Sequence, residues 1–469
     1  MNIPNMLDAK RRSNKEVCIT NYKFNDDYTN IGNNRTFYIK TYGCQMNEHD
    51  SEKLKGILSS AGFIESSSAY NSDIVILNTC AIRENAHNKV FGFLGRMKHL
   101  KETNKNLIVG ICGCMAQEET IVNEIMNKYK WLDIVFGTHN IDKLLDYIVS
   151  INNKTIIESM SIEGYICENI PCIRSNNISA YVDIIYGCDK FCTYCIVPYT
   201  RGKQRSRRKE DIINEVIDLK KCGYKEVTLL GQNVNAYGKD LYDDYDLSDL
   251  LKDVGDTKIC RIKFLTSHPW DFTDRMINTI SKIPNIVPYI HLPVQSGSDK
   301  ILKRMGRRYT KKSYLELYSK LKASVQGVSI TTDIIVGFPG ETEEDFNDTL
   351  KLVDEAKFSC AYTFAYSKRE ATPAYSMENQ VPEDLKSKRL YILNEKINNL
   401  SLLENKKLIG TTIKCLVMST SIKNNNNVVG YTDTNKLVNI VGDASLIGKI
   451  IPVKITDAKS FSLDGEAQK

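Results

Sequence analysis

Short β-branched runs that alternate with amphipathic stretches constrain the fold of this 469-residue chain more than any other feature. Each run is long enough for one strand, and each amphipathic stretch is long enough for a helix. This alternation is typical of a parallel sheet with helices on its faces. The predicted strands are Thr36–Lys40, Asp73–Leu77, Leu107–Ile111 and Asp133–Phe136, and the predicted helices are Glu48–Ala61, Ala81–Lys101, Met115–Lys128 and Ile141–Val149. We therefore expect a parallel-sheet α/β domain at residues 36–152, after a polar extension at residues 1–35.

The alternation resumes with longer units in the middle of the chain. The predicted strands there are Tyr181–Tyr186, Glu226–Leu230, Cys260–Leu265, Val287–Leu292, Val328–Val336 and Ser359–Tyr366. Six strand–helix units in one domain predict a partial (β/α) barrel at residues 175–405. A long polar helix at Pro382–Lys407 follows the last strand, and the aperiodic residues 151–178 are interpreted as a linker.

The tail, residues 407–469, contains only short β runs. They are Thr412–Met418, Val428–Thr432, Leu437–Val441 and Gly448–Ile455. Gly-Asp and Asp-Gly pairs near these runs are typical of turns. This pattern predicts a small β-barrel.

The composition narrows the class of protein. Apolar residues make up 42% of the chain and charged residues 26%, which is a globular composition. No apolar stretch approaches the length of about 20 residues that a membrane-spanning helix needs. The first residues of the sequence are polar and contain no apolar region of a signal peptide. We therefore expect a cytoplasmic protein with no membrane partner. In a reducing compartment, the 14 cysteines indicate metal binding or catalysis rather than disulfides. The net charge of +6 permits a nucleic-acid partner without requiring one.

Three cysteines, Cys188, Cys192 and Cys195, lie close together in the loop after the first strand of the expected barrel. Three thiolates at this spacing can face one point, and such soft ligands suit an iron–sulfur cluster. A cubane held by three protein thiolates leaves one iron open to a small molecule. Zinc is the competing interpretation, but a structural zinc site needs four ligands, and no fourth cysteine or histidine lies nearby in the sequence.

Three more cysteines, Cys44, Cys80 and Cys114, are far apart in the sequence, yet each follows a predicted strand of the N-terminal sheet. The carboxyl ends of neighbouring parallel strands line one crevice, so we expect a second three-thiolate cluster there. The alternative is that these cysteines are buried small hydrophobic residues. Cys112 shares strand parity with Cys114, and we prefer Cys114 as the ligand because it begins the loop.

The segment Gly187-Cys-Asp-Lys-Phe-Cys-Thr-Tyr-Cys195, on the first strand of a partial barrel, resembles the radical S-adenosylmethionine (SAM) superfamily. The resemblance implies a [4Fe–4S] cluster whose open iron binds SAM, and reductive cleavage of SAM to a 5′-deoxyadenosyl radical. It also implies that one aromatic residue flanks the adenine of SAM and that two strand ends hold the rest of the SAM molecule. The matching residues are Tyr194, Gly231, Gln232, Asn233, Gly337 and Gly340. The alternative for Tyr194 is a plain packing role.

The short sequence segments that contain Cys44, Cys80 and Cys114 precede such a barrel in this order. They resemble the methylthiotransferase family. In this family the N-terminal cluster is auxiliary and supplies or carries the inserted sulfur. The resemblance therefore implies two [4Fe–4S] clusters and SAM as cofactors. Residues 231–238, 291–298 and 366–373 match the branch that acts on N6-(dimethylallyl)adenosine in tRNA. The implied reaction is methylthiolation at C2 of that nucleoside, next to the anticodon.

A basic run follows the cysteine loop of the expected barrel. Its residues are Arg201, Lys203, Arg205, Arg207 and Arg208. Such a run is usually a solvated surface, but its place beside the expected active-site mouth favours contact with RNA phosphates. The tail resembles the TRAM domain, a small five-stranded RNA-binding barrel.

The expected partners are tRNA carrying N6-(dimethylallyl)adenosine and an electron donor, and we expect a monomer. One rival is a methylthiotransferase acting on threonylcarbamoyladenosine. A rival from another class is a two-cluster electron carrier with an RNA-binding tail, although a carrier needs no barrel cavity. Cys167 and Cys172 in the linker are interpreted as structural. The other cysteines are expected to be inert, namely Cys18, Cys222, Cys260, Cys360 and Cys415.

Overall fold

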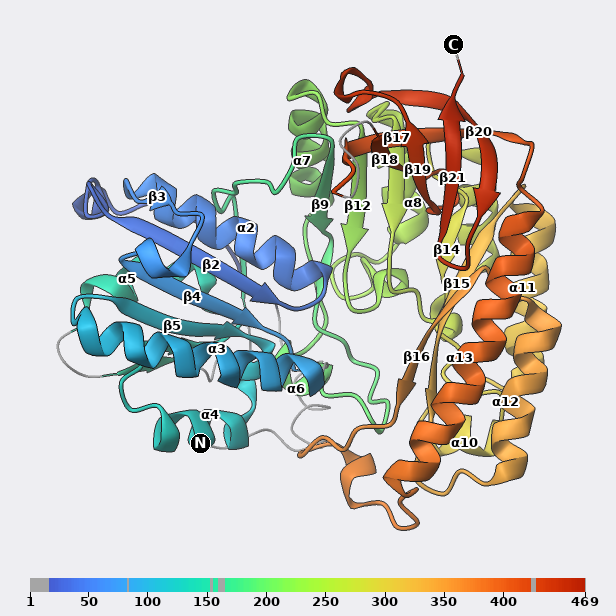
Figure 1. Ribbon diagram of the computed structural model, residues 1–469, viewed down its shortest axis with the longest axis horizontal. Helices are drawn as coiled ribbons and strands as arrows, with labels where there is room; N and C mark the ends of the chain where they lie inside the picture. Colours follow the sequence, from blue (N-terminus) through green and yellow to red (C-terminus); the bar gives the residue numbers. More distant parts are fainter. Residues whose placement is uncertain (1–16, 82–83, 152–154, 159–164, 423–426, 469) are drawn as a thin grey trace.

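In the computed structural model, which describes residues 17–81, 84–151, 155–158, 165–422 and 427–468, six parallel strands form the sheet of the N-terminal domain (Figure 1). In sheet order they are β3 (Ile64–Glu65), β2 (Thr36–Tyr42), β4 (Ile74–Thr79), β5 (Ile108–Gly113), β6 (Ile134–Phe136) and β7 (Ile156–Glu158). The helices of this domain are α2 (Gln45–Ser60), α3 (Glu84–Thr103), α4 (Glu119–Lys128) and α5 (Leu144–Val149).

Both faces of this sheet are buried, which explains the unbroken apolar run of its central strand. On β4, Ile74 and Ile76 pack with residues of α2 and α5. Val75 and Leu77 point the other way and pack with residues of α3 and α4. Successive side chains of a strand alternate between faces, so a strand covered on both sides is apolar at every position.

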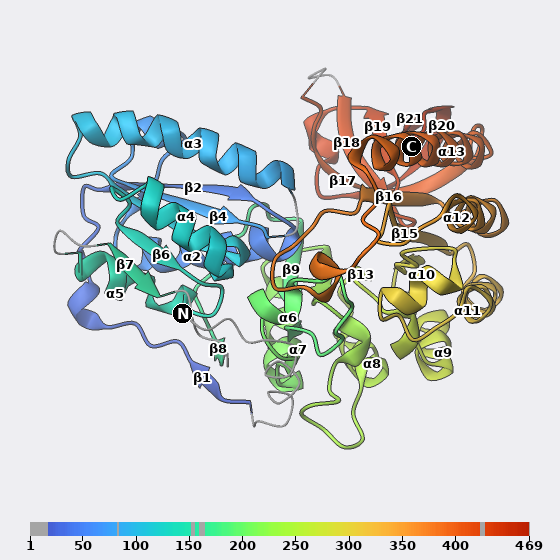
Figure 2. The ribbon, with the colours of Figure 1, turned by 90° about the horizontal axis from the view of Figure 1, so that it is seen from below.

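The central domain contains six parallel strands in two three-stranded sheets, joined by a parallel bridge between Ile262 and Ile286. In spatial order they are β9 (Ser179–Asp183), β12 (Glu226–Leu230), β13 (Arg261–Phe264), β14 (Tyr289–His291), β15 (Ser329–Val336) and β16 (Cys360–Ala365). The helices are α6 (Val197–Thr200), α7 (Lys209–Lys221), α8 (Leu247–Asp256), α9 (Asp274–Lys282), α10 (Asp299–Arg304), α11 (Lys311–Ser324), α12 (Glu343–Ala356) and α13 (Glu383–Lys406). Figure 2 shows α8, α9, α11 and α12 along the outer side of the strands. The expected partial barrel is confirmed.

The tail folds into a closed barrel, which lies at one end of the central domain in Figure 1. Its strands, in the order in which they pair, are β17 (Thr412–Thr420), β18 (Asn427–Thr432), β19 (Leu437–Val441), β21 (Ser462–Ala467) and β20 (Ile450–Ala458). Strand β21 was not among the predicted runs, because Ser462-Leu-Asp-Gly-Glu-Ala is mostly polar. The buried residues of this strand are Leu463, which lies in the core of the barrel, and Gly465.

Two expectations about segment boundaries were wrong. The interpreted linker contributes β7 to the N-terminal sheet, so this domain extends past residue 152. The linker also contains β8 (Ile166–Glu168), which pairs in parallel with β1 (Ile19–Asn21) of the interpreted extension. Across the residues that the structure describes, we find no helix with the length and apolar character of a membrane span.

One buried arginine joins the tail to the central barrel. Arg261, at the amino end of β13, donates through Nε to Glu226 Oε2 at 2.9 Å. Its Nη1 donates to Asp433 Oδ1 at 2.7 Å, and its Nη2 donates to the backbone oxygen of Thr432 at 2.8 Å. Thr432 is the last residue of β18, and Asp433 follows it in the turn between β18 and β19. The tail is therefore docked on the barrel by a buried charged network.

We expect Arg261→Ala to lower the free energy of unfolding by up to about 3–5 kcal/mol, because it removes the guanidinium partner of the buried Glu226 carboxylate and leaves only Lys263 paired with it. Arg275→Ala is the matched control: Arg275 also pairs with two carboxylates, but its side chain is 53% exposed. The control should cost no more than about 1 kcal/mol. Urea denaturation of both variants measures the difference, and equal losses would contradict the docking role of Arg261.

Candidate active site

The three N-terminal cysteines lie together at one edge of the sheet. The strand register places the carboxyl ends of β2, β4 and β5 side by side. Cys44, Cys80 and Cys114 follow these three strands within two residues. Cys80 forms a hydrogen bond with Cys44, and Cys114 and Cys44 are close enough to interact electrostatically. The convergence of strand ends is therefore confirmed, and the role of these cysteines as cluster ligands stays a prediction.

Glycine and asparagine residues shape the loops that carry these cysteines. Gly113 has a φ of +95°, and a side chain there would lie 2.4 Å from the backbone oxygen of Thr79. Asn47 Oδ1 accepts from the backbone N–H of Cys44 at 3.4 Å, and its Nδ2 donates to Asn78 Oδ1 at 3.0 Å. The Asn47–Asn78 pair thus ties the loop after β2 to the end of β4.

The pKa of Cys44 fits a ligand role. The hydrogen bond from Cys80 lowers the pKa of Cys44 to about 6, and the positive charge of Arg201 acts in the same direction against the effect of burial. The thiolate is the form of cysteine that binds metal. A thiol whose pKa lies near 6 is ionised at neutral pH.

Cys112 and Cys114 have different surroundings. Cys112, still within β5, packs in the apolar core beneath α2 and α5 with residues such as Phe136. Cys114 begins a 3-10 turn, Cys114–Gln117, and packs with Ala81, which directly follows Cys80. The structure therefore places Cys114, and not Cys112, with Cys44 and Cys80.

The second set of cysteines lies in a loop closed by a short antiparallel pair, β10 (Ile185–Tyr186) and β11 (Arg205–Ser206). Gly187 has a φ of +70°, and a side chain there would lie 2.0 Å from the backbone oxygen of Lys203. The backbone N–H of Cys188 donates to the oxygen of Gly202 at 3.2 Å. Only glycine at position 187 lets the two sides of the loop approach this closely.

The cysteines of this loop interact with one another. Burial and the charge of Cys192 raise the pKa of Cys195 to about 12, and burial together with the other two thiols also raises the pKa of Cys188. A bound metal cation would remove the protons of these thiols. Arg307 Nη1 donates to Cys192 Sγ at 3.4 Å. No spacing rule connects Arg307 with this loop, so its contact with Cys192 could not be predicted from sequence patterns.

The residues expected to bind SAM surround this loop. Gln232 Oε1 accepts from the backbone N–H of Gly187 at 2.5 Å, and Asn233 Nδ2 donates to Asp271 at 2.8 Å. Asn233 Oδ1 is buried without a partner among the described residues. A side chain at Gly231 would lie 2.3 Å from Ile185. These two strand ends, after β10 and β12, are therefore packed against each other.

The other predicted SAM residues lie at the carboxyl end of β15. Gly337 and Gly340 have φ values of +72° and +79°, which favour glycine. Between them, Phe338 packs edge-on against Tyr194, with ring centroids 6.4 Å apart. The structure thus brings Tyr194 and this turn together, as expected for the two sides of one ligand. Their contact with SAM stays a prediction.

The two cysteine loops meet across the domain interface. Cys114 and Ala81 of the N-terminal domain pack with Ile196 and Tyr199 in one small buried cluster. Ile196 directly follows Cys195, and Tyr199 lies on α6, the helix that begins immediately after it. Two clusters held by these loops would therefore face one another.

The basic run after the second loop is not an RNA surface. Four of its five residues are buried, namely Arg201, Lys203, Arg205 and Arg207. The prediction that these four contact RNA phosphates was wrong, because buried side chains paired within the protein do not reach a polyanion. Arg207 donates to Glu168 at 2.6 Å and to Glu215 at 2.8 Å. Arg208 is exposed and pairs with Asp211 at 2.6 Å.

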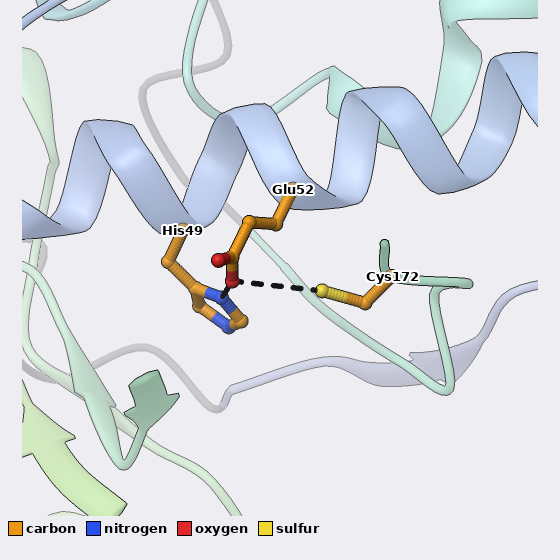
Figure 3. Close-up of side chains that lie close together, drawn as sticks. All are labelled: His49, Glu52 and Cys172. Carbon is orange, nitrogen blue, oxygen red and sulfur yellow. Dashed lines mark hydrogen bonds and ion pairs between the residues drawn. The ribbon is translucent and has the colours of Figure 1, made fainter. Parts of the chain in front are cut away.

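His49, Glu52 and Cys172 form a further group, shown in Figure 3. Glu52 Oε2 lies 3.1 Å from His49 Nδ1 and accepts from Cys172 Sγ at 3.9 Å. Arg174 donates to the same oxygen at 3.3 Å and lies 3.1 Å from His49 Nδ1. A guanidinium on both ligand atoms opposes a metal cation, so this group is a polar network that fastens α2 to the segment before β9.

The inner face of the barrel is open to solvent at its last strand. Tyr362 and Phe364 on β16 are 49% and 47% exposed. Ala361, on the opposite face of the strand, packs in the core with residues of α13 on the outer side. Phe364 is paired in register with Ile335, which packs against the cluster that contains Phe338. Two aromatic rings therefore line the barrel interior beside the predicted SAM residues.

Comparison with known proteins covers all three domains. Residues 36–137 match the model of the uncharacterized protein family UPF0004, residues 182–353 match the radical SAM superfamily, and residues 406–467 match the TRAM domain. The chain is 51% identical over 99% of its length to a protein of Staphylococcus aureus (strain MRSA252) named tRNA-2-methylthio-N(6)-dimethylallyladenosine synthase, of which it covers 91%. A protein of the same name from strain JH9 is 50% identical with the same coverage.

Solved structures support the fold. A radical SAM methyltransferase, TsrM from Kitasatospora setae, with cobalamin and a [4Fe–4S] cluster bound, matches 73% of this chain and 77% of its own. The TM-score is 0.52 and the identity is 11%. The same enzyme with tryptophan and a SAM analogue bound gives a TM-score of 0.53 at 11% identity, with 73% of this chain and 75% of that chain covered.

We expect Cys114→Ala to remove the iron held by the N-terminal domain, and Cys112→Ala to keep it. Cys112 lies in the apolar core, so its replacement should cost only a packing loss of roughly 1 kcal/mol. Iron and sulfide are quantified after anaerobic reconstitution of both variants. The ligand would be Cys112, two residues earlier, if Cys112→Ala lost the iron and Cys114→Ala kept it.

Proposed function

The chain belongs to the family of the tRNA-2-methylthio-N(6)-dimethylallyladenosine synthases, and from this premise we propose which of its residues carry the reaction. It is a radical SAM methylthiotransferase that converts N6-(dimethylallyl)adenosine in tRNA to its 2-methylthio derivative. Its cofactors are SAM and two [4Fe–4S] clusters. When bound, they supply a 5′-deoxyadenosyl radical and the sulfur that is inserted.

The contact between the two cysteine loops is the main support for the following assignment of cluster ligands. Cys188, Cys192 and Cys195 hold the cluster that binds SAM, and Cys44, Cys80 and Cys114 hold the auxiliary cluster. Cys114 packs against Ile196, the neighbour of Cys195. A substrate placed at this contact lies within reach of both clusters. The reaction requires this, because it removes hydrogen from a carbon and adds sulfur to the same carbon.

The protein orients SAM with the strand ends of the central barrel. Tyr194 and Phe338 provide an aromatic wall for the adenine. The turn containing Gly337 and Gly340 gives close access to the backbone. Asn233, whose Oδ1 has no partner in the described residues, offers an acceptor for the amino group of SAM. Gly231 and Gln232 hold this strand end against the cysteine loop.

The target base enters the open inner face of β16. Tyr362 and Phe364 offer the exposed aromatic surface on which a flipped base stacks, and enzymes that modify a base inside a folded nucleic acid read it in this way. The apolar Ile335 beside Phe364 suits the dimethylallyl group. An electron carrier has no use for such a surface inside a barrel, which argues against that rival.

The tail binds the rest of the tRNA. Lys414 on β17 and Lys454 on β20 are exposed on neighbouring strands of the tail barrel and suit phosphate contacts. The enzyme acts as a cytoplasmic monomer with a separate electron donor. We divide the chain into residues 36–152, extended by β7, residues 175–405 and residues 407–469.

We expect Cys44→Ala to separate radical formation from sulfur insertion. The barrel cluster keeps all of its ligands in one loop, so the variant should still convert SAM to 5′-deoxyadenosine under reduction. It should form no methylthio product on tRNA, because a cubane that loses one of three protein thiolates is poorly held. Mass spectrometry of the nucleosides and of 5′-deoxyadenosine measures both outcomes.

Cys222→Ala, at an exposed cysteine of the central domain, is the control and should leave both activities unchanged. Full methylthiolation by Cys44→Ala would refute the auxiliary site. A product with threonylcarbamoyladenosine in place of the dimethylallyl nucleoside would favour the other branch of the family.

We expect Phe364→Ala to raise KM for the modified tRNA by about 5- to 150-fold, the equivalent of the about 1–3 kcal/mol that one stacked base contributes. SAM affinity, measured by calorimetry on the cluster-loaded enzyme, should stay unchanged. Tyr391→Ala removes an aromatic ring that is 70% exposed on α13, away from the inner face, and should have no effect on KM. Equal effects of the two substitutions would show that the base does not stack on β16.

A further inference from the structure

Arg201 links the loop of the barrel cysteines to the N-terminal cysteines. It directly follows α6, and its side chain crosses into the N-terminal domain. Its Nε donates to Cys114 Sγ at 3.2 Å, and its Nη2 donates to Asp50 Oδ2 on α2 at 2.8 Å. The side chains of Arg201 and Asp50 are only 5% and 4% exposed. Both interactions are therefore shielded from water and salt.

The guanidinium lies directly at the predicted site of the auxiliary cluster. It donates to the sulfur of Cys114, one of the three predicted ligands, at 3.2 Å. A guanidinium stays charged in proteins, so its donation does not depend on pH. A cluster held by thiolates gains negative charge on reduction. A nearby cation and a hydrogen bond to a ligand sulfur both favour the reduced state and raise the reduction potential.

Asp50 fixes the direction of this arginine and opposes its charge. With Nη2 held by Asp50, the Nε–H of Arg201 is directed at Cys114. Asp50 itself places a negative charge beside the same site. Loss of the arginine and loss of the aspartate charge are therefore expected to shift the potential in opposite directions.

The barrel loop contains a matched arrangement. Arg307 Nη1 donates to Cys192 Sγ at 3.4 Å and is also buried. Each cysteine loop thus has one guanidinium on one ligand sulfur. Arg201 differs because it reaches its sulfur from the other domain, and Arg307 lies in the same domain as Cys192.

We propose that Arg201 is a positioning residue that raises the reduction potential of the auxiliary cluster and holds this cluster against the loop of the radical-generating one. This inference rests on the proposed function, since it requires that Cys44, Cys80 and Cys114 bind a cluster. It gives a role to a basic residue whose predicted contact with RNA the structure excludes. It also explains why a cation is buried at this interface instead of lying on the surface.

The test uses the full chain with Cys188, Cys192 and Cys195 all replaced by Ala, so that only the auxiliary cluster is reconstituted. Its potential is measured by redox titration followed by electron paramagnetic resonance. Arg201→Gln should make the potential more negative, and Asp50→Asn should make it more positive. Arg201→Lys keeps the charge and should give a value between those of Gln and Arg. Arg307→Gln in the same background should leave the potential unchanged.

Two results would contradict the proposed role of Arg201, and a third would contradict the auxiliary site itself. An unchanged potential in Arg201→Gln would refute the electrostatic role. Loss of iron in both Arg201→Gln and Arg201→Lys would make Arg201 a purely structural anchor and would also overturn it. Absence of iron from the parent with Arg201 intact would instead refute the auxiliary site in the proposed function.

Discussion

The packing of Cys114 against Ile196 brings two cysteine loops together, and much of the chain serves to maintain this contact. Each loop follows the carboxyl ends of a parallel sheet, and the two sheets belong to different domains. Two such edges face one another only if the domains are held firmly. The ion pair between Arg201 and Asp50 and the network around Glu52 provide this connection with buried charges. Buried charges tolerate little displacement, since separation leaves each of them unpaired.

The alternation of apolar runs was sufficient to predict the main sheets, because strands buried on both faces are recognisable from local sequence. The short strands β1, β7 and β8 were not predictable in this way. Each has only three residues, and β1 pairs with a segment far along the chain, as the register of Ile19 with Ile166 shows. So short a strand is recognisable from sequence only where all of its residues are apolar, as in Ile134–Phe136 of β6. Its formation depends on a partner that the local sequence does not reveal.

The same limit applies to the site. The positions of Cys44, Cys80 and Cys114 after predicted strands were enough to predict their meeting, because the geometry of a parallel sheet fixes where strand ends lie. The basic run was misinterpreted because a sequence reports charge but not solvation. The partner of Arg201 is Asp50, which lies 151 positions earlier in the chain. Neither that pairing nor the contact of Arg307 with Cys192 has a sequence spacing from which it could be inferred.

The docking of the tail has a consequence for the size of the ligand. The turn between β18 and β19 meets Arg261 at the amino end of β13, whereas the cysteine loops lie beyond the carboxyl ends of the barrel strands. The longest of these strands, β15, has eight residues and spans about 26 Å. A molecule that touches both the tail and the cysteine loops must cover a comparable length. A free nucleoside can occupy only one end, so this architecture favours a rigid, folded polymer that presents its reactive base at a fixed distance from its anchor.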